Sequence, residues 1–115
     1  MNEKHMIAFE EHFDVPISKL VRMEKIMVFS SAVTDIRLIT DVLTTLNLPY
    51  KVVIMSMGKL RNRDGFKQLQ ELTDWDFLPQ IFIEGKFIGG ISEFLQLNLK
   101  DTDVLSEMHN QAEIS

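Results

Sequence analysis

The 115-residue chain has a formal net charge of −5 at pH 7, is 45% hydrophobic and 25% charged, and contains no cysteine. This length and composition predict one globular domain, and the acidic balance argues against nucleic acids and anionic membranes as partners. The lack of cysteine excludes disulfides, thiol nucleophiles, thiolate zinc sites and cysteine-ligated iron–sulfur clusters within these residues. With no membrane-spanning run and no signal or transit peptide in the acidic N-terminus, we expect a cytoplasmic protein.

Residues 1–24 are predicted to form a helical extension ahead of the main domain. Asp14 followed by Pro16 is typical of a helix start, with Asp14 as the N-cap and the proline in the first turn. Apolar side chains that would form helical faces lie on both sides of this start: Met6, Ile7, Phe9 and Phe13 before it, and Ile17, Leu20 and Val21 after it.

A β-α-β unit is predicted next. Ile26–Phe29 is a continuous apolar run, which is typical of a strand buried on both faces. After a short polar loop, apolar residues recur at helical spacing from Ile36 to Leu46, and Pro49 ends that helix. Tyr50–Met55, rich in Val and Ile, is predicted to form the second, parallel strand.

The segment 75–97 is the most strongly patterned part of the chain. Gln80–Ile83 and Phe87–Ile88 are predicted to pair as a β-hairpin around a Gly-containing turn, and Gly89–Gly90 ends the second strand. Ser92 precedes an apolar run as a helix N-cap would. Two more helices are predicted: one before the hairpin, with Phe66, Leu69 and Leu72 on one face, and one after an Asp101-Thr102-Asp103 cap, with Val104, Leu105 and Met108 facing inward.

This segment resembles the C-terminal half of a glutaredoxin, which typically reads V-P-Q-x-F-I-x-G-x-x-I-G-G-C-S/D-D-L. The chain reads Leu78-Pro79-Gln80-Ile81-Phe82-Ile83, then Gly85, then Phe87-Ile88-Gly89-Gly90-Ile91-Ser92-Glu93-Phe94, and Trp75 is similar to the tryptophan of the monothiol pattern N-W-P-T-F-P-Q. The resemblance implies one α/β domain with a thioredoxin-like fold of glutaredoxin type, a mixed four-stranded sheet flanked by helices, and a cis Leu78–Pro79 bond. Residues 25–109 would form the core and 110–115 a tail.

The resemblance also implies a glutathione site, formed by main chain and a helix start. Backbone N–H groups at a helix start point outward and attract a carboxylate. The alternative is a plain connection between hairpin and helix. The implied residues are Leu78, Pro79, Gly89, Gly90, Ile91, Ser92 and Glu93.

The loop after the first strand departs from the family pattern, C-P-Y-C or C-G-F-S. The cysteine position falls on Val33 or on Thr34, depending on the direction of counting, and the family's lysine falls near Ser31. Disulfide exchange requires sulfur, and a hydroxyl nucleophile requires a positioned base. We therefore expect Ser31, Thr34 and Asp35 to cap the next helix rather than to act in catalysis.

Thiol-free relatives give a functional expectation. The chain is similar to the SH3-domain-binding glutamate-rich-like branch, although no P-x-x-P ridge for SH3 binding is present. We expect a redox-inactive binding or regulatory module for a partner protein or thiol peptide, with no required cofactor and at most weak glutathione binding. The alternatives are a glutathione-dependent enzyme, glutaredoxin- or transferase-like, in which Thr34 or Ser31 orients the thiol of glutathione itself, and an oxidoreductase by descent alone.

Two further features are left open. His5, His12 and His109 are isolated in the sequence, so we expect no metal site. Trp75 and Phe77 are expected to form either an exposed aromatic edge or half-buried packing beside the hairpin.

Overall fold

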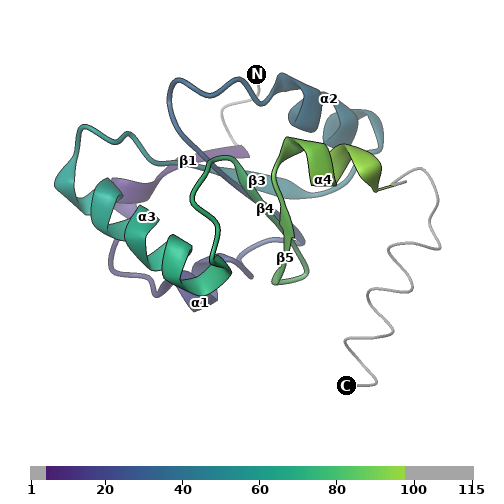
Figure 1. Cartoon of the computed structure of the whole chain (residues 1–115). Coiled ribbons are helices and arrows are strands. Elements are labelled where there is room, and N and C mark those ends of the chain that lie inside the picture. Colours follow the sequence, from purple (N-terminus) through teal and green to yellow (C-terminus); the bar gives the residue numbers. More distant parts are fainter. Residues whose placement is uncertain (1–4, 98–115) are drawn as a thin grey trace.

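The computed structural model describes residues 5–97 (Figure 1). The predicted helix after Asp101 and the predicted tail at 110–115 lie outside the described residues. In chain order the elements are β1 (Met6–Ala8), the 3-10 helix η2 (Phe9–Glu11), α1 (Ile17–Leu20), β2 (Ile26–Ser30), α2 (Arg37–Thr45), β3 (Tyr50–Ile54), α3 (Leu60–Thr73), β4 (Gln80–Ile83), β5 (Lys86–Gly89) and α4 (Ile91–Gln96).

The strands form one mixed sheet in the order β1-β3-β2-β4-β5. β2 is parallel to β3 and antiparallel to β4, and β4 pairs with β5 as the predicted hairpin. Glu84 and Gly85 connect this hairpin with φ angles of 54° and 80°, which suits a two-residue turn with left-handed residues. The α/β class, the mixed sheet and the flanking helices are therefore confirmed.

The N-terminal segment differs from the prediction. Met6–Ala8 is a strand rather than part of a helix, and it pairs in parallel with Val52–Ile54 of β3. The sheet therefore has five strands instead of four, and residues 6–24 belong to the folded core rather than to a helical extension. The physical reason is that the outer edge of β3 offers unpaired backbone groups, which a short strand from elsewhere in the chain can satisfy.

Two apolar layers cover the two faces of the sheet. Along β2, Ile26 and Val28 face one layer while Met27 and Phe29 face the other, as the alternation of a strand requires. Figure 1 shows α2 and α4 on one side of the sheet and α1 and α3 on the other. A strand buried on both faces at the centre of a sheet is what the continuous apolar run predicted.

Two details of the predicted helices are corrected. The N-cap position of α1 is Pro16, in an extended conformation and without a side-chain hydrogen bond, so Asp14 is not the cap. Asp14 lies two residues too early to reach the N–H groups of the first turn. In α3, Leu72 in the last turn is half exposed, whereas Leu69 is fully buried.

Candidate binding site

Three segments meet at one end of the sheet. β2 and β4 are antiparallel with Phe29 opposite Gln80, so the loop after β2 (31–36) and the loop before β4 (74–79) leave the sheet at the same end. The start of α4 joins them, because a Cβ added at Gly90 would lie 3.5 Å from the carbonyl oxygen of Pro79 and 3.9 Å from Cζ2 of Trp75.

The loop 74–79 is fixed by a buried side chain. Gln80 is fully buried; its Nε2 donates to the carbonyl oxygen of Trp75 at 2.9 Å, and its Oε1 accepts from the hydroxyl of Thr73 at 2.8 Å. The Leu78–Pro79 bond in this loop is cis, as predicted. Sequence reasoning missed the role of Gln80, although a glutamine at the start of an otherwise apolar strand is a signal that could have revealed it.

The two aromatic residues of the loop behave differently. Trp75 is half-buried and packs edge-to-face on Phe87 of β5, with ring centroids 5.6 Å apart. Phe77 points to solvent, with 71% of its surface exposed. The loop therefore combines an aromatic anchor that holds it to the hairpin with an exposed aromatic ring.

The start of α4 is capped by an acid rather than by a hydroxyl. Gly90 is the N-cap residue, so Ser92 is inside the helix and is not the cap. Glu93 reaches back, and its Oε1 accepts from the N–H of Gly90 at 2.9 Å, while its side chain lies across Gly89, which has φ of 129°. The spacing of glycine and glutamate resembles half of a capping box, a signal that sequence reasoning overlooked.

The implied glutathione-binding residues fall into two groups. Pro79, Gly90 and Glu93 come together as described, with Gly89 beneath the Glu93 side chain. The others border this cluster in the chain: Leu78 and Ile91 are half-buried, and Ser92 is exposed.

The loop 31–36 holds no reactive arrangement. Val33 is 95% exposed, and the hydroxyls of Ser31 and Thr34 share a hydrogen bond of 2.7 Å with each other. The N-cap position of α2 is Ile36, without a side-chain hydrogen bond. Ser31 and Thr34 therefore do not cap α2, because their hydroxyls satisfy each other within the loop.

Asp35 does reach the helix start, as predicted. Its Oδ1 accepts from the N–H of Arg37 at 3.0 Å, and its Oδ2 accepts from Nη2 of the same arginine at 2.7 Å. The Arg37 guanidinium lowers the pKa of Asp35 from 3.8 to about 2. A cavity of about 320 Å³ lies beside this pair, lined by Asp35, Arg37, Leu38 and Asp41. Arg37 is paired with Asp35, and Asp41 adds a second carboxylate, so the lining is acidic overall.

Comparisons with known proteins agree with this architecture. No family model matches the sequence. The chloroplastic monothiol glutaredoxin-S14 of Arabidopsis thaliana is 31% identical over 81 residues, which cover 64% of this chain and 44% of that protein. The mitochondrial monothiol glutaredoxin-5 of Schizosaccharomyces pombe is 28% identical over 61 residues, 53% of this chain and 34% of that protein. The chain thus spans less than half the length of these curated relatives.

Solved structures give the same result. The crystal structure of wheat glutaredoxin is similar with a TM-score of 0.68 and 25% identity, covering 78% of this chain and 87% of that one. These similarities support a glutaredoxin family assignment. The loop 31–36 of this chain has no cysteine at either candidate position. The similarity to the SH3-domain-binding glutamate-rich-like branch stays a prediction.

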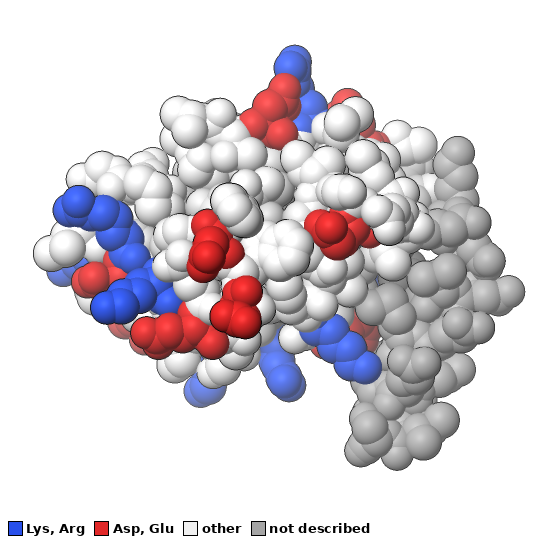
Figure 2. Space-filling model, in the orientation of Figure 1, with Lys and Arg blue, Asp and Glu red and all other residues white. Residues whose placement is uncertain are grey.

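The charges around this glutaredoxin-type site are acidic. The segments 31–36, 74–79 and 89–93 contain Asp35, Asp74, Asp76 and Glu93 and no Lys or Arg. In Figure 2 acidic side chains lie across the face that carries the 74–79 loop and α4, while basic side chains gather toward the N-terminal end of α3. A ligand with several carboxylates therefore finds little cationic support at this face.

The histidines do not come together in the described part of the chain. His5 stacks on Tyr50 with ring centroids 4.3 Å apart, Nδ1 of His12 lies 3.3 Å from the carbonyl oxygen of Ala8, and His109 lies outside residues 5–97. Within that range no three His, Asp or Glu side chains are grouped to hold a metal ion. Nor does any helix within it have both the length and the apolar character needed to cross a bilayer.

Proposed function

We propose that this chain is a redox-inactive binding module with a glutaredoxin fold, which engages a partner protein through the face formed by loops 31–36 and 74–79. The observation that carries the proposal is the exposure of Val33 and Phe77, 95% and 71% respectively. Both lie on loops that leave the same end of the sheet, and Val33 stands at a position of the lost cysteine. Exposed apolar groups gathered at one place are typical of interaction sites.

The composition of this face favours a particular chemistry of partner. Its apolar groups are flanked by Asp74 and Asp76, which are exposed, while the nearest arginine is paired with Asp35. A partner segment with an apolar side chain and a neighbouring lysine or arginine would complement both features. Regulation by occupancy of this face, in the cytoplasm, is part of the same proposal.

Weak glutathione binding is the second part of the proposal. The main chain of Leu78 and the N–H groups of Ile91 and Ser92 would hold the peptide, but the N–H of Gly90 is already bound by Glu93. Each charge-assisted contact absent relative to the family costs about 1.5–3 kcal/mol. We therefore expect a dissociation constant no better than about 1 mM, which corresponds to about −4 kcal/mol.

Glutathione titration by NMR tests this part. The amide signals of Leu78, Gly90, Ile91 and Ser92 should shift together and weakly, with half-saturation in the millimolar range. If nothing moves at tens of millimolar, glutathione is not a ligand of this chain. Micromolar binding would show that Val33 or Thr34 contributes an additional contact.

Affinity capture tests the partner surface. Wild-type protein should retain partners that neither the Val33→Asp variant nor the Phe77→Asp variant retains. Met23→Asp is the matched control, since Met23 is 45% exposed but precedes β2, at the other end of the sheet. If the two variants retain the same proteins as wild type, the proposal that this face binds a partner is refuted.

A mixed-disulfide assay with glutathione tests redox inactivity. No turnover above the protein-free blank is expected, because disulfide exchange requires a thiolate and the chain adds none to the glutathione already in the blank. Turnover by protein whose mass confirms the cysteine-free sequence would favour an enzyme that uses the thiol of glutathione itself.

A further inference from the structure

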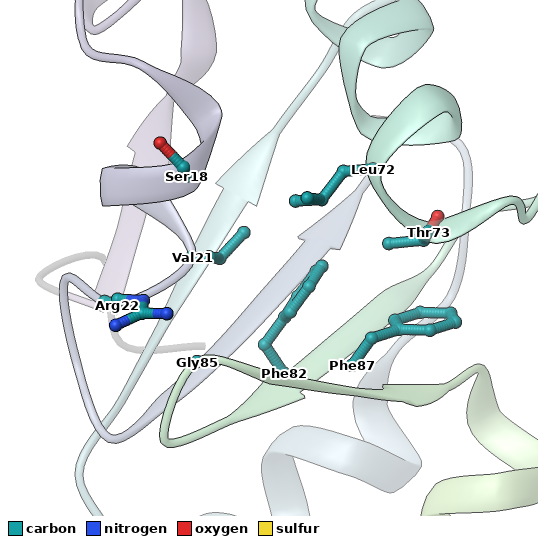
Figure 3. Close-up of a pocket in the computed structure, with 8 residues that line it drawn as sticks. All are labelled: Ser18, Val21, Arg22, Leu72, Thr73, Phe82, Gly85 and Phe87. Carbon is teal, nitrogen blue, oxygen red and sulfur yellow. The ribbon is translucent and has the colours of Figure 1, made fainter.

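A separate cavity of about 220 Å³ lies between α1, α3 and the β4–β5 hairpin (Figure 3). None of its lining residues belongs to the segments 31–36, 74–79 and 89–93, although Thr73 and Phe87 contact Gln80 and Trp75 on their other sides. It is lined by Ser18, Val21, Arg22, Leu72, Thr73, Phe82, Gly85 and Phe87.

The floor of the cavity is apolar, while Ser18, Arg22 and Thr73 contribute polar groups to its lining. The rings of Phe82 and Phe87 pack with centroids 5.4 Å apart, and Figure 3 shows both beneath the space between the two helices. Val21, directly after α1, and Leu72 from α3 flank them, and Leu72 is half exposed. These surfaces suit an aromatic ring, because aromatic pairs gain energy beyond the area that they bury.

The positively charged side chain of Arg22 lies at the edge of this cavity. The Arg22 side chain lies along Gly85 and occupies the space that a Cβ at that position would need. A Cβ added to Gly85 would be 2.9 Å from Cγ and 3.1 Å from Nε of Arg22. Among residues 5–97 the Arg22 guanidinium has neither a hydrogen bond nor an ion pair. A guanidinium that is held along its stem and lacks a partner is well suited to bind a carboxylate.

The volume limits the ligand. A cavity of about 150 Å³ accepts benzene, and sites for drug-sized molecules begin at about 300 Å³. At about 220 Å³ there is room for one ring and a short arm.

We propose that this cavity binds a small aromatic monocarboxylate, with the ring on Phe82 and Phe87 and the carboxylate on Arg22.

The test is an NMR titration with 3-phenylpropionate, compared with 3-phenylpropionamide, which has the same ring and arm without the charge. Signals of Val21, Leu72, Phe82 and Phe87 should shift with the acid, and the amide should bind about fivefold more weakly, as expected for one partly exposed ionic contact.

Three variants make the test specific. Arg22→Gln should weaken binding of the acid about fivefold and leave binding of the amide unchanged. Lys19→Gln, a neutralisation on the exposed side of α1, should change neither. Ser18→Phe should fill the opening from an exposed position and abolish the shifts of both ligands, while its remaining amide spectrum confirms the fold.

Equal affinity for acid and amide would overturn the proposal, as would a Lys19→Gln effect as large as that of Arg22→Gln. Shifts that persist in Ser18→Phe, or an absence of shifts at tens of millimolar acid, would also overturn it.

Discussion

At residue 65 the backbone of a helix touches an aromatic ring from a distant part of the sequence. A Cβ added to Gly65 of α3 would collide with Cζ and Cε2 of Phe9 and would lie 3.0 Å from Cε of Met55. Phe9 and Met55 are both buried. Packing therefore explains why residue 65 is a glycine, because glycine is otherwise unfavourable in the interior of a helix.

Gly65→Ala is expected to destabilise the protein even though alanine is the better helix former. Overpacking costs about 1–3 kcal/mol and the gain in helix propensity is about 1 kcal/mol, so the net loss in urea denaturation should be as much as about 2 kcal/mol. Gly58→Ala is the control, since nothing lies within 4 Å of that added Cβ. A Gly65→Ala variant as stable as Gly58→Ala would contradict the close contact.

Glu10 links the N-terminal segment to α3 through charge. Its Oε1 accepts from Nζ of Lys59 at 2.7 Å, and its Oε2 accepts from Nδ2 of the buried Asn62 at 3.1 Å. The hydrogen bond from Lys59, followed by those from the backbone and from Asn62, lowers the pKa of Glu10 from 4.5 to about 2. A lowered carboxyl pKa stabilises the fold above pH 4.5, and this contribution is lost as the pH falls from 4.5 to 2.

Glu10→Gln should therefore be less stable than wild type at pH 7, and the gap should narrow between pH 4.5 and pH 2. Urea denaturation at pH 7, 4 and 2.5 measures this trend. Glu11→Gln removes the same charge from the same short helix and controls for net charge. The same narrowing in Glu11→Gln would assign the effect to overall charge instead of to the Lys59 pair.

At the scale of elements, the entry to α4 depends on one acidic side chain. Glu93→Ala should cost about 1 kcal/mol, the usual value of an N-terminal cap, and should speed hydrogen exchange of the Gly90 amide. Ser92→Ala should change stability by less than about 0.5 kcal/mol, because Ser92 is exposed and its hydroxyl accepts only a long hydrogen bond of 3.4 Å from Gln96. The reverse order of the two effects would restore Ser92 as the cap.

The elements also show what the sequence could predict. Ile26–Phe29, the Gln80–Ile83 strand and the Gly89–Gly90 end are set by local patterns, and all three lie where expected. Met6–Ala8 could not be placed, because its pairing depends on the edge of β3, more than forty residues away. The predicted cap of α4 was wrong for another reason. Serine and glutamate both fit the sequence rules for helix caps, and only the three-dimensional geometry decides between them.

For the whole molecule, the N-terminal segment completes the core on the α3 side of the sheet. Phe9 is 2% exposed within that core. Phe9→Ala should lower the free energy of unfolding by about 3–5 kcal/mol. Phe13→Ala is the matched substitution: Phe13 is 47% exposed and lies under Arg61 at 3.8 Å, so its loss should cost about 0.5–1 kcal/mol. Equal losses in thermal unfolding would mean that residues 6–13 do not fold with the sheet.

The contact between Phe9 and Gly65 also has a consequence for how related sequences can diverge. Because the ring and the helix backbone share one small volume, substitutions at the two positions should not accumulate independently. Descendants of this chain with a larger residue at position 65 should carry a smaller one than phenylalanine at position 9. Chains that begin after Phe9 should be free of that restriction and should tolerate alanine or serine at position 65.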